Sequence, residues 1–474
     1  MKQRTQFARA AVAAVAASVA LSACSSGGGS SNPYVPPKTV GSALRIVGMG
    51  DSLTAGVQSN GLMGEDTTNP IPGSPFATVQ ATQEHGFWAL LWQQANPGVD
   101  ISDPSVSPLP LIAAPGIGTV LTLNGQGSPT PITTACGGLN QIAYNFSKAL
   151  GVRLAPKNAP FDIGVPGQTM HEAVYQYQPT GPCNTLPGPI GALGALLSEN
   201  NYFYPVLGNY GVGHTQLQAA VALRPHITTV WLGSNDLLKY AFSGGAVGPT
   251  SPAQFSSDLA TIIRTLQTAG SKVAVSNLVD VLNAAFFFPG PEVEAVITGN
   301  FLKLGLPLPV AEAFAAELAA EIEKESGVGP NGGWLTLQGL GKTFAAFQNG
   351  QSTIGLVPQG DYVTAALGAS LQKSNDALNS AIASTVAANG ATLVDIHAQF
   401  AQIVANGGIY PLNSKCCSLQ YEGGFFSWDG IHPSNTGYAV LANTFIGTLD
   451  KAYGLSIPQV DVGAIYATDP YAPH

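Results

Sequence analysis

The sequence contains few charged residues, and basic residues are the rarer kind. Asp, Glu, Lys and Arg make up 9% of its 474 residues, with 27 acidic and 18 basic side chains, against roughly 25% in an ordinary soluble domain. Neither a disordered tail nor a coiled coil has so few charges. The scattered basic residues also exclude the positive surface that nucleic-acid binding requires. With 45% hydrophobic residues, the chain is expected to bury a large core.

The amino end lacks an apolar run long enough to span a membrane. The uncharged stretch 10–23 has 14 residues, whereas a transmembrane helix needs about 20. Three basic residues precede this stretch, which is the arrangement of a secretory signal peptide. The sequence Leu21-Ser22-Ala23-Cys24 resembles the lipobox of bacterial lipoproteins, in which the cysteine becomes acylated. The alternative is an ordinary signal peptide in which Cys24 is incidental.

The segment after Cys24 has the composition of a linker. Residues 25–37 are a Gly/Ser run followed by prolines, which makes a flexible and then stiffer tether. We therefore expect a signal peptide over 1–23, lipidation of Cys24 and a tether over 24–40. The protein would be an exported bacterial cell-envelope lipoprotein, held at a membrane by its lipid anchor and facing the periplasm or the outer surface.

Cysteine is scarce, with five in the chain. Apart from Cys24, four remain for an oxidising compartment, which allows three pairings of Cys136, Cys183, Cys416 and Cys417. The adjacent Cys416 and Cys417 can bridge each other only through a strained ring, so pairing with distant partners is an alternative. No Cys-x-x-Cys or His-x-x-x-His pair occurs, so a metal site and a metal cofactor have little support.

Hydrophobic patterning predicts an α/β fold. Short apolar, β-branched runs alternate with segments that carry apolar residues at three- and four-residue spacing. The expected strands are 44–49, 161–165, 227–232, 272–278 and 392–396, and the clearest helices are 255–266, 371–388 and 435–453. Strands that alternate with helices form a parallel sheet with right-handed crossovers. The sequence has no repeat of fixed period, which excludes solenoids and propellers.

Two regions interrupt this alternation and are expected to be long insertions. Residues 60–158 are rich in Pro, Gly, Thr and Ser, with a helix expected near 87–94, and residues 283–361 form the second insertion. Within the latter, the apolar stretch 286–310 is either a lid or acyl-binding wall or packed core. The whole folded domain is expected to cover 41–456, followed by a tail over 457–474.

Two short segments carry groups for nucleophilic chemistry. Ser52 follows the first expected strand in the sequence GMGDSLTAG, where a strand turns into a helix. A hydroxyl at a helix amino end lies near unpaired N–H groups and the positive end of the helix dipole, although the same serine could simply cap the helix. In SWDGIHPS, Asp429 precedes His432 by three residues, so its carboxylate can bind one imidazole nitrogen and leave the other free to accept a proton from a serine.

Two further segments could hold a developing negative charge. GSND places Asn235 at the carboxyl end of the expected strand 227–232, which is where ligands bind in open parallel sheets. GVPGQT follows the expected strand 161–165, and Gly167 could expose its backbone N–H without obstruction by a side chain. Either segment alone could equally be an ordinary turn.

Taken together and in this order, GDSLTAG, GVPGQT, GSND and DGIHP resemble the sequence blocks of the GDSL or SGNH hydrolases. The resemblance extends from 44 to about 453, except for the two insertions. One departure is Asp162, where many relatives have Asn. The resemblance implies a three-layer, flavodoxin-like fold with a five-stranded parallel sheet in the order 2-1-3-4-5 and helices on both faces.

The resemblance also implies a role for each matching residue. Ser52 would be the nucleophile, His432 its general base and Asp429 the residue that orients His432. The backbone N–H groups of Ser52 and Gly167 and the amide of Asn235 would form the oxyanion hole. Asp51 and Asp236 are expected to be turn-forming neighbours.

These roles predict an esterase or lipase without a cofactor, acting on lipid-like or acylated small esters. Two alternatives stay open, namely a glycan O-deacetylase of the same family and a non-catalytic surface lipoprotein that binds glycan or protein partners. The oligomeric state and the acyl-chain length of the substrate do not follow from the sequence.

Overall fold

The computed structural model describes residues 43–68, 78–114, 116–118, 121–123, 129–131, 153–155, 157–175, 206–207, 214–409 and 416–473. The predicted signal peptide, the lipidation site Cys24 and the tether over 24–40 lie outside these residues, as do Cys136 and Cys183. Among the helices in these ranges, none is both long and apolar enough to cross a membrane.

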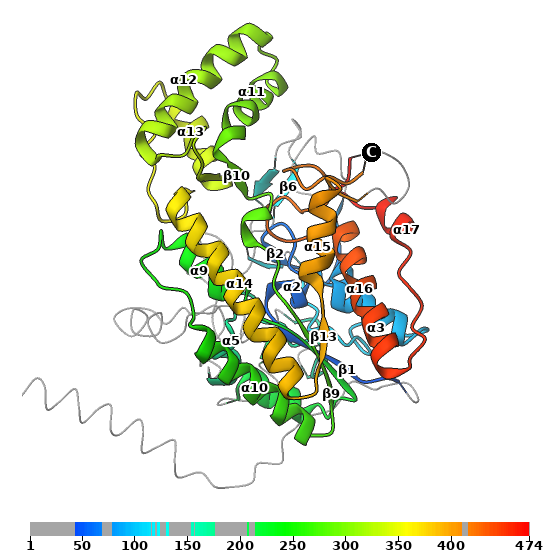
Figure 1. Cartoon of the computed structure of the whole chain (residues 1–474). Coiled ribbons are helices and arrows are strands. Elements are labelled where there is room, and N and C mark those ends of the chain that lie inside the picture. The colour runs from blue at the N-terminus through cyan, green and yellow to red at the C-terminus, as the bar shows by residue number, and fades with distance from the viewer. Residues whose placement is uncertain are drawn as a thin grey trace, which may run out of the picture. The chain divides into compact units, whose positions relative to one another are not determined.

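A parallel sheet forms the centre of the fold, as the sequence predicts (Figure 1). Its strands run in the order β1-β8-β9-β13, and each neighbouring pair is parallel. The strands are β1 (Ile46–Gly50), β8 (Ile227–Trp231), β9 (Lys272–Ser276) and β13 (Thr392–Val394). Every residue of β1 and β8 is buried, which requires cover on both faces of the sheet.

The expected strand 161–165 runs beside β1 but does not form a regular strand. Asp162 makes an isolated parallel bridge with Gly48, and the Ile163 and Val165 N–H groups donate to the Gly48 and Gly50 carbonyls at 2.9 and 3.0 Å. The segment is flanked by Pro160 and Pro166, which have no N–H group to extend a hydrogen-bonded ladder. The described sheet therefore has four regular strands, where the resemblance implied five.

Helices cover both faces of the sheet (Figure 1). On one side, α8 (Gln216–Ala222) packs on β1, α10 (Pro252–Thr268) on β9 and α14 (Ala365–Ala388) on β13. Helix α10 also contacts α14 and α5 (Met170–Tyr175). On the other side, α16 (Asn435–Tyr453) packs on β13 and on α3 (Phe87–Ala95). Ser251 caps α10 by accepting from the Gln254 N–H, and Pro252 stands at its first turn, both common helix-start features. Two further helices, α9 (Ser234–Phe242) and α15 (Ile396–Ala405), follow β8 and β13 along the chain.

The first expected insertion contains one helix of the core. Helix α3 (Phe87–Ala95) packs against α16, and the Phe87 ring lies 4.6 Å from the Phe445 ring and 5.1 Å from the Trp231 ring. The rest of the described part of this region forms short antiparallel pairs. They are β2 (Gly61–Leu62) with β5 (Ile117–Gly118), β3 (Thr67–Thr68) with β4 (Thr78–Val79), and β6 (Leu121–Leu123) with β7 (Pro129–Pro131).

The second insertion has an apolar core of its own. It comprises β10 (Phe287–Pro289), α11 (Val293–Lys303), α12 (Leu308–Ser326), β11 (Trp334–Thr336), α13 (Leu337–Gln348) and β12 (Tyr362–Val363), with the strands in one antiparallel sheet. Phe288, Ile297 and Phe301 are buried in its core. Leu304 and Leu308 at the junction of α11 and α12 are instead 64% and 51% exposed. The first part of 286–310 is therefore packed core, and its end is an exposed apolar junction.

The carboxyl-terminal tail folds back onto the domain. After α17 (Val462–Tyr466), the buried Asp469 carboxylate accepts hydrogen bonds from the Thr436 N–H and hydroxyl at 2.7 and 2.6 Å. Tyr471 is also buried, and its ring lies 5.3 Å from the Trp428 ring. Nearby, Cys416 and Cys417 are bonded to each other, so cross-pairing, the alternative considered for these two cysteines, is wrong.

Candidate active site

One apolar pocket brings together three of the predicted site residues. Ser52, Asn235 and His432 line it, although 183 and 197 positions separate them along the chain. Ser52 follows the end of β1, and Asn235 follows the end of the neighbouring β8. The carboxyl ends of adjacent parallel strands lie at the same edge of the sheet, which is why these two side chains meet.

Ser52 opens a very short helix, α2 (Ser52–Ala55), directly after Asp51. The Asp51 carboxylate caps this turn by accepting from the Leu53 N–H at 3.0 Å. Because α2 has 4 residues, it contributes little of the helix dipole that the sequence led us to expect at this position. The close packing of the turn depends on Gly164, where a Cβ would lie 2.5 Å from the Ala55 nitrogen.

His432 is oriented by Asp429. The two side chains meet at 2.8 Å between His432 Nδ1 and Asp429 Oδ2. The other carboxylate oxygen accepts from the Ile431 and His432 N–H groups, each at 2.8 Å. With Nδ1 bound to the carboxylate, Nε2 is the nitrogen left to exchange a proton, as a general base requires.

Asp429 is buried yet remains the charged partner. Burial by itself raises the pKa of this carboxyl, but the His432 charge and the hydrogen bonds from His432 and Ile431 outweigh it and lower the pKa below the ordinary value. The Asp429 carboxylate therefore stays ionised at neutral pH and can hold the imidazole in one tautomer.

The loop after α2 is tied to the segment that carries Asp429 and His432. The Asn60 N–H donates to Asp429 Oδ2 at 2.6 Å, and the Ser59 N–H donates to the Ser427 hydroxyl at 2.8 Å. Both Ser59 and Asn60 have positive φ, 49° and 63°. Sequence reasoning missed this support, although Asn60-Gly61 is a recognisable turn signal.

The Asn235 amide is positioned by two acceptors. Its Nδ2 donates to Asp51 Oδ2 at 3.2 Å and to the Gln168 carbonyl at 3.1 Å. Gly167 has a φ of 82° and precedes Gln168, so the predicted oxyanion residue lies one residue from the Asn235 contact, although it does not line the pocket itself.

Asp51 and Asp236 do more than form turns. Both are buried, and burial raises the pKa of Asp51 to about 7 and that of Asp236 to about 6. Asp51 binds the Asn235 amide, whereas Asp236 accepts from the Met170 N–H at 3.0 Å and from the Thr250 hydroxyl at 2.6 Å. The two carboxyls therefore connect the segments that carry the predicted site.

Gln216 is a further residue that the sequence analysis did not find. Its fully buried side-chain amide donates to the Gly50 carbonyl at 2.6 Å and to the Ile163 carbonyl at 2.7 Å. It thus joins the end of β1 to the segment beside it. A lone glutamine in a helix gives no sequence signal of such a role.

Asp162 is buried with an incomplete set of partners. Its Oδ1 accepts from the Gly164 N–H at 2.9 Å, and within the described part of the chain its Oδ2 is buried without a hydrogen-bond partner. Burial raises the pKa of this carboxyl well above its usual value. A neutral Asp162 resembles asparagine in charge and shape, which fits the departure noted in the sequence.

Asp162→Asn is expected to stabilise the protein increasingly as the pH rises. The pKa of the Asp162 carboxyl is higher in the folded protein than in the unfolded chain. The contribution of the neutral carboxyl to the free energy of unfolding is therefore complete below the unfolded-state pKa, and it is lost as the pH rises towards the folded-state pKa. Asparagine has no such loss, so the variant should gain about 1 to 3 kcal/mol near pH 8. Thermal unfolding of both proteins at about pH 4 and pH 8 tests this; a difference that does not grow with pH contradicts it.

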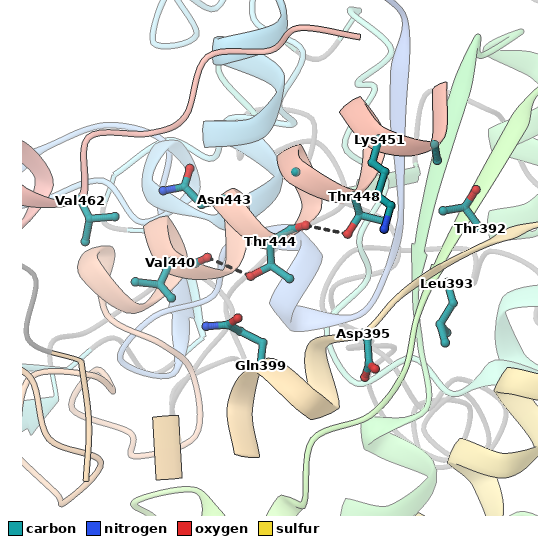
Figure 2. A pocket seen from close by; sticks show the side chains of 12 residues that line it. Thr392, Leu393, Asp395, Gln399, Val440, Asn443, Thr444, Thr448, Lys451 and Val462 are labelled. Atoms are coloured by element: carbon teal, nitrogen blue, oxygen red, sulfur yellow. Dashed lines mark hydrogen bonds between the residues drawn. The ribbon is translucent and has the colours of Figure 1, made fainter. Parts of the chain in front are cut away.

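A different pocket lies between β13, α15 and α16 (Figure 2). The hydroxyls of Thr444 and Thr448 in its wall bind carbonyls of their own helix, at 3.3 and 2.9 Å. None of the predicted site residues lines it. Over the ranges that the structure describes, no group of three or more His, Cys, Asp or Glu side chains could hold a metal ion.

Comparison with known proteins identifies one matching family. A sequence model of the family described as "GDSL-like Lipase/Acylhydrolase" matches residues 46–445. A solved structure titled "Crystal Structure of TesA" is similar at 15% sequence identity and a TM-score of 0.23, over 50% of this chain and 69% of that chain. No curated protein matches the sequence.

Proposed function

This chain belongs to the GDSL-like lipase/acylhydrolase family, and from that premise we propose that it cleaves carboxylic esters through an acyl-enzyme on Ser52. One observation carries the proposal: Ser52, Asn235 and His432 line one pocket, and His432 is held by the buried carboxylate of Asp429. A nucleophile, a general base with its orienting acid and a hydrogen-bond donor are the groups that acyl transfer requires.

The reaction proceeds in two steps. The Ser52 oxygen attacks the ester carbonyl while His432 Nε2 takes the serine proton, and the proton then passes to the leaving alcohol as the acyl-enzyme forms. Water then attacks the acyl-enzyme while His432 takes its proton, and this proton passes to the Ser52 oxygen as its bond to the acyl group breaks and the acid is released. Asp429 stays ionised throughout and stabilises the imidazolium.

The tetrahedral oxyanion would be held by the N–H groups of Ser52 and Gly167 and by the Asn235 amide. Because the amide already donates to Asp51 and to the Gln168 carbonyl, the oxyanion would replace or share one of these acceptors. Preorganised donors of this kind stabilise charge that develops only in the transition state.

Asn235→Ala is expected to lower kcat by about 10² to 10³ with a small change in KM, because one oxyanion donor is lost. Steady-state kinetics on a short p-nitrophenyl ester measure it. Asn349→Ala is a matched control, since Asn349 is exposed at the carboxyl end of α13 and does not line the pocket. A loss confined to KM would contradict the role of Asn235 in the transition state.

The pocket favours lipid-like esters over acetylated glycans. Beside Ser52 its walls are largely hydrophobic, with Leu238, Val279, Val281, Phe400 and Phe426 among them. Such walls bind an acyl chain by burying apolar surface, whereas a sugar needs polar partners. A soluble protein beginning after Cys24 should therefore hydrolyse p-nitrophenyl esters faster as the acyl chain grows from acetyl to lauroyl.

Activity confined to acetyl esters would instead support glycan O-deacetylation. The binding-lipoprotein alternative predicts no hydrolysis at any chain length and no covalent labelling by a serine-directed phosphonate, whereas an acyl hydrolase would be labelled at Ser52.

A further inference from the structure

A long cleft adjoins the candidate active site. It runs between the second insertion and the loop over 416–422, and Ala284 lines both this cleft and the pocket that contains Ser52. The volume of the cleft is about 1050 Å³. The two hollows therefore adjoin at Ala284, and a chain bound at Ser52 would reach the cleft by passing this residue.

The inner surface of the cleft is mostly apolar. Phe288, Val296, Leu340 and Phe344 line it from the insertion, and Leu419 lines it from the loop. Charged groups also line it, and one pair connects its two sides, because Lys303 of α11 forms an ion pair with Glu422 of the loop. An apolar surface that adjoins a catalytic pocket suits a hydrocarbon chain.

The insertion that forms the cleft is joined to the catalytic turn. The Phe286 N–H donates to the Gly430 carbonyl at 2.8 Å, and a Cβ on Gly430 would lie 2.8 Å from the Phe286 nitrogen. From the other side of the cleft, the Tyr421 hydroxyl donates to the Trp428 carbonyl at 2.9 Å. Both walls therefore have a hydrogen-bonded connection to the segment that carries Asp429 and His432.

Two glycines within helices line the cleft. Gly299 lies in the middle of α11 and Gly341 in α13, and both line the cleft. A Cβ at either position would meet no atom within 4 Å, and neither residue has a positive φ. Glycine destabilises a helix interior relative to alanine, and neither backbone conformation nor packing requires it here. A side chain at either position would therefore have open space around its Cβ, beside the other residues that line the cleft.

We infer that this cleft binds the far end of a long acyl chain whose ester group lies at Ser52. The position of the ester rests on the proposed function, whereas binding of the chain does not. Each buried methylene raises affinity by a factor of about four. Binding should therefore strengthen with chain length until the cleft is filled.

Filling the cleft tests the inference without relying on catalysis. In the Ser52→Ala background, Gly299→Phe and Gly341→Phe should each weaken binding of hexadecanoic acid by about tenfold or more, equivalent to two lost methylene contacts. Octanoic acid, whose chain is half as long and would make fewer contacts in the cleft, should bind within about twofold of the parent. Displacement of a fluorescent fatty acid measures both.

A matched control is Gly447→Phe. Gly447 also lies in the middle of a helix, a Cβ there also meets no atom within 4 Å, and it lines the separate pocket of Figure 2. It should leave both affinities unchanged. Gly299→Ala should retain hexadecanoic acid binding, and thermal unfolding of each variant checks that it is folded.

Equal weakening by all three phenylalanine variants, or unchanged binding of hexadecanoic acid in Gly299→Phe and Gly341→Phe, overturns the inference. Failure of the proposed function would appear elsewhere, as an absence of Ser52-dependent hydrolysis at every chain length. In the Ser52-intact enzyme, the two cleft variants should lower kcat/KM for hexadecanoyl esters selectively and leave acetyl esters within about twofold.

Discussion

Ser52→Ala is expected to lower kcat for ester hydrolysis by about 10⁶-fold, to the level that binding and the oxyanion donors alone provide. The reason is that no acyl-enzyme can form without the hydroxyl, while the pocket itself stays intact. Ser52 is half-buried, and its truncation removes a single oxygen atom, so folding should be unchanged. Steady-state kinetics and labelling by a serine-directed phosphonate both measure the loss.

A matched control for this variant is Ser374→Ala. The Ser374 hydroxyl donates to the Ser370 carbonyl within α14, at 2.8 Å, far along the chain from each motif. This variant should hydrolyse esters and take up the phosphonate at the wild-type rate. If the Ser52→Ala protein hydrolyses esters with the wild-type kcat, Ser52 is not the nucleophile.

Asp429→Asn is expected to lower kcat by about 10⁴, because the imidazole would be held in the wrong tautomer. In the structure, Oδ2 accepts from both His432 Nδ1 and the Asn60 N–H, and Oδ1 accepts from two backbone N–H groups. An asparagine must direct its NH₂ group at one of these donor sets, so a hydrogen bond is lost whichever way the amide is oriented. A pH–rate profile and thermal unfolding together measure the result.

Asp461→Asn is a control in which an aspartate outside the candidate active site is replaced by asparagine. Asp461 caps α17 by accepting from the Ala464 N–H at 3.0 Å, and asparagine caps a helix equally well. Its kinetics should match those of the wild type. If Asp429→Asn retains more than a tenth of the wild-type kcat at every pH, a carboxylate is not needed to orient His432.

Local sequence was sufficient to predict the layout of the domain and the family. The runs that became β1, β8, β9 and β13 are apolar and short, and their alternation with amphipathic helices is a local property that needs no knowledge of distant contacts. The segment 161–165 was harder, because the prolines around it limit its ladder to a single bridge. The local pattern places helix α3 in an insertion, because only its packing on α16 reveals that it belongs to the core.

The sequence by itself determined the motifs, the family to which they belong and the Asp429–His432 pairing, because these depend on residues that are close along the chain. Only the tertiary structure decided that Ser52, Asn235 and His432 share a pocket, that Asp51 holds the Asn235 amide and that Asn60 supports Asp429. It also decided that the second insertion lines a cleft that adjoins this pocket at Ala284. Such contacts join residues hundreds of positions apart, and the pairing of distant surfaces depends on how the whole chain packs rather than on any local pattern.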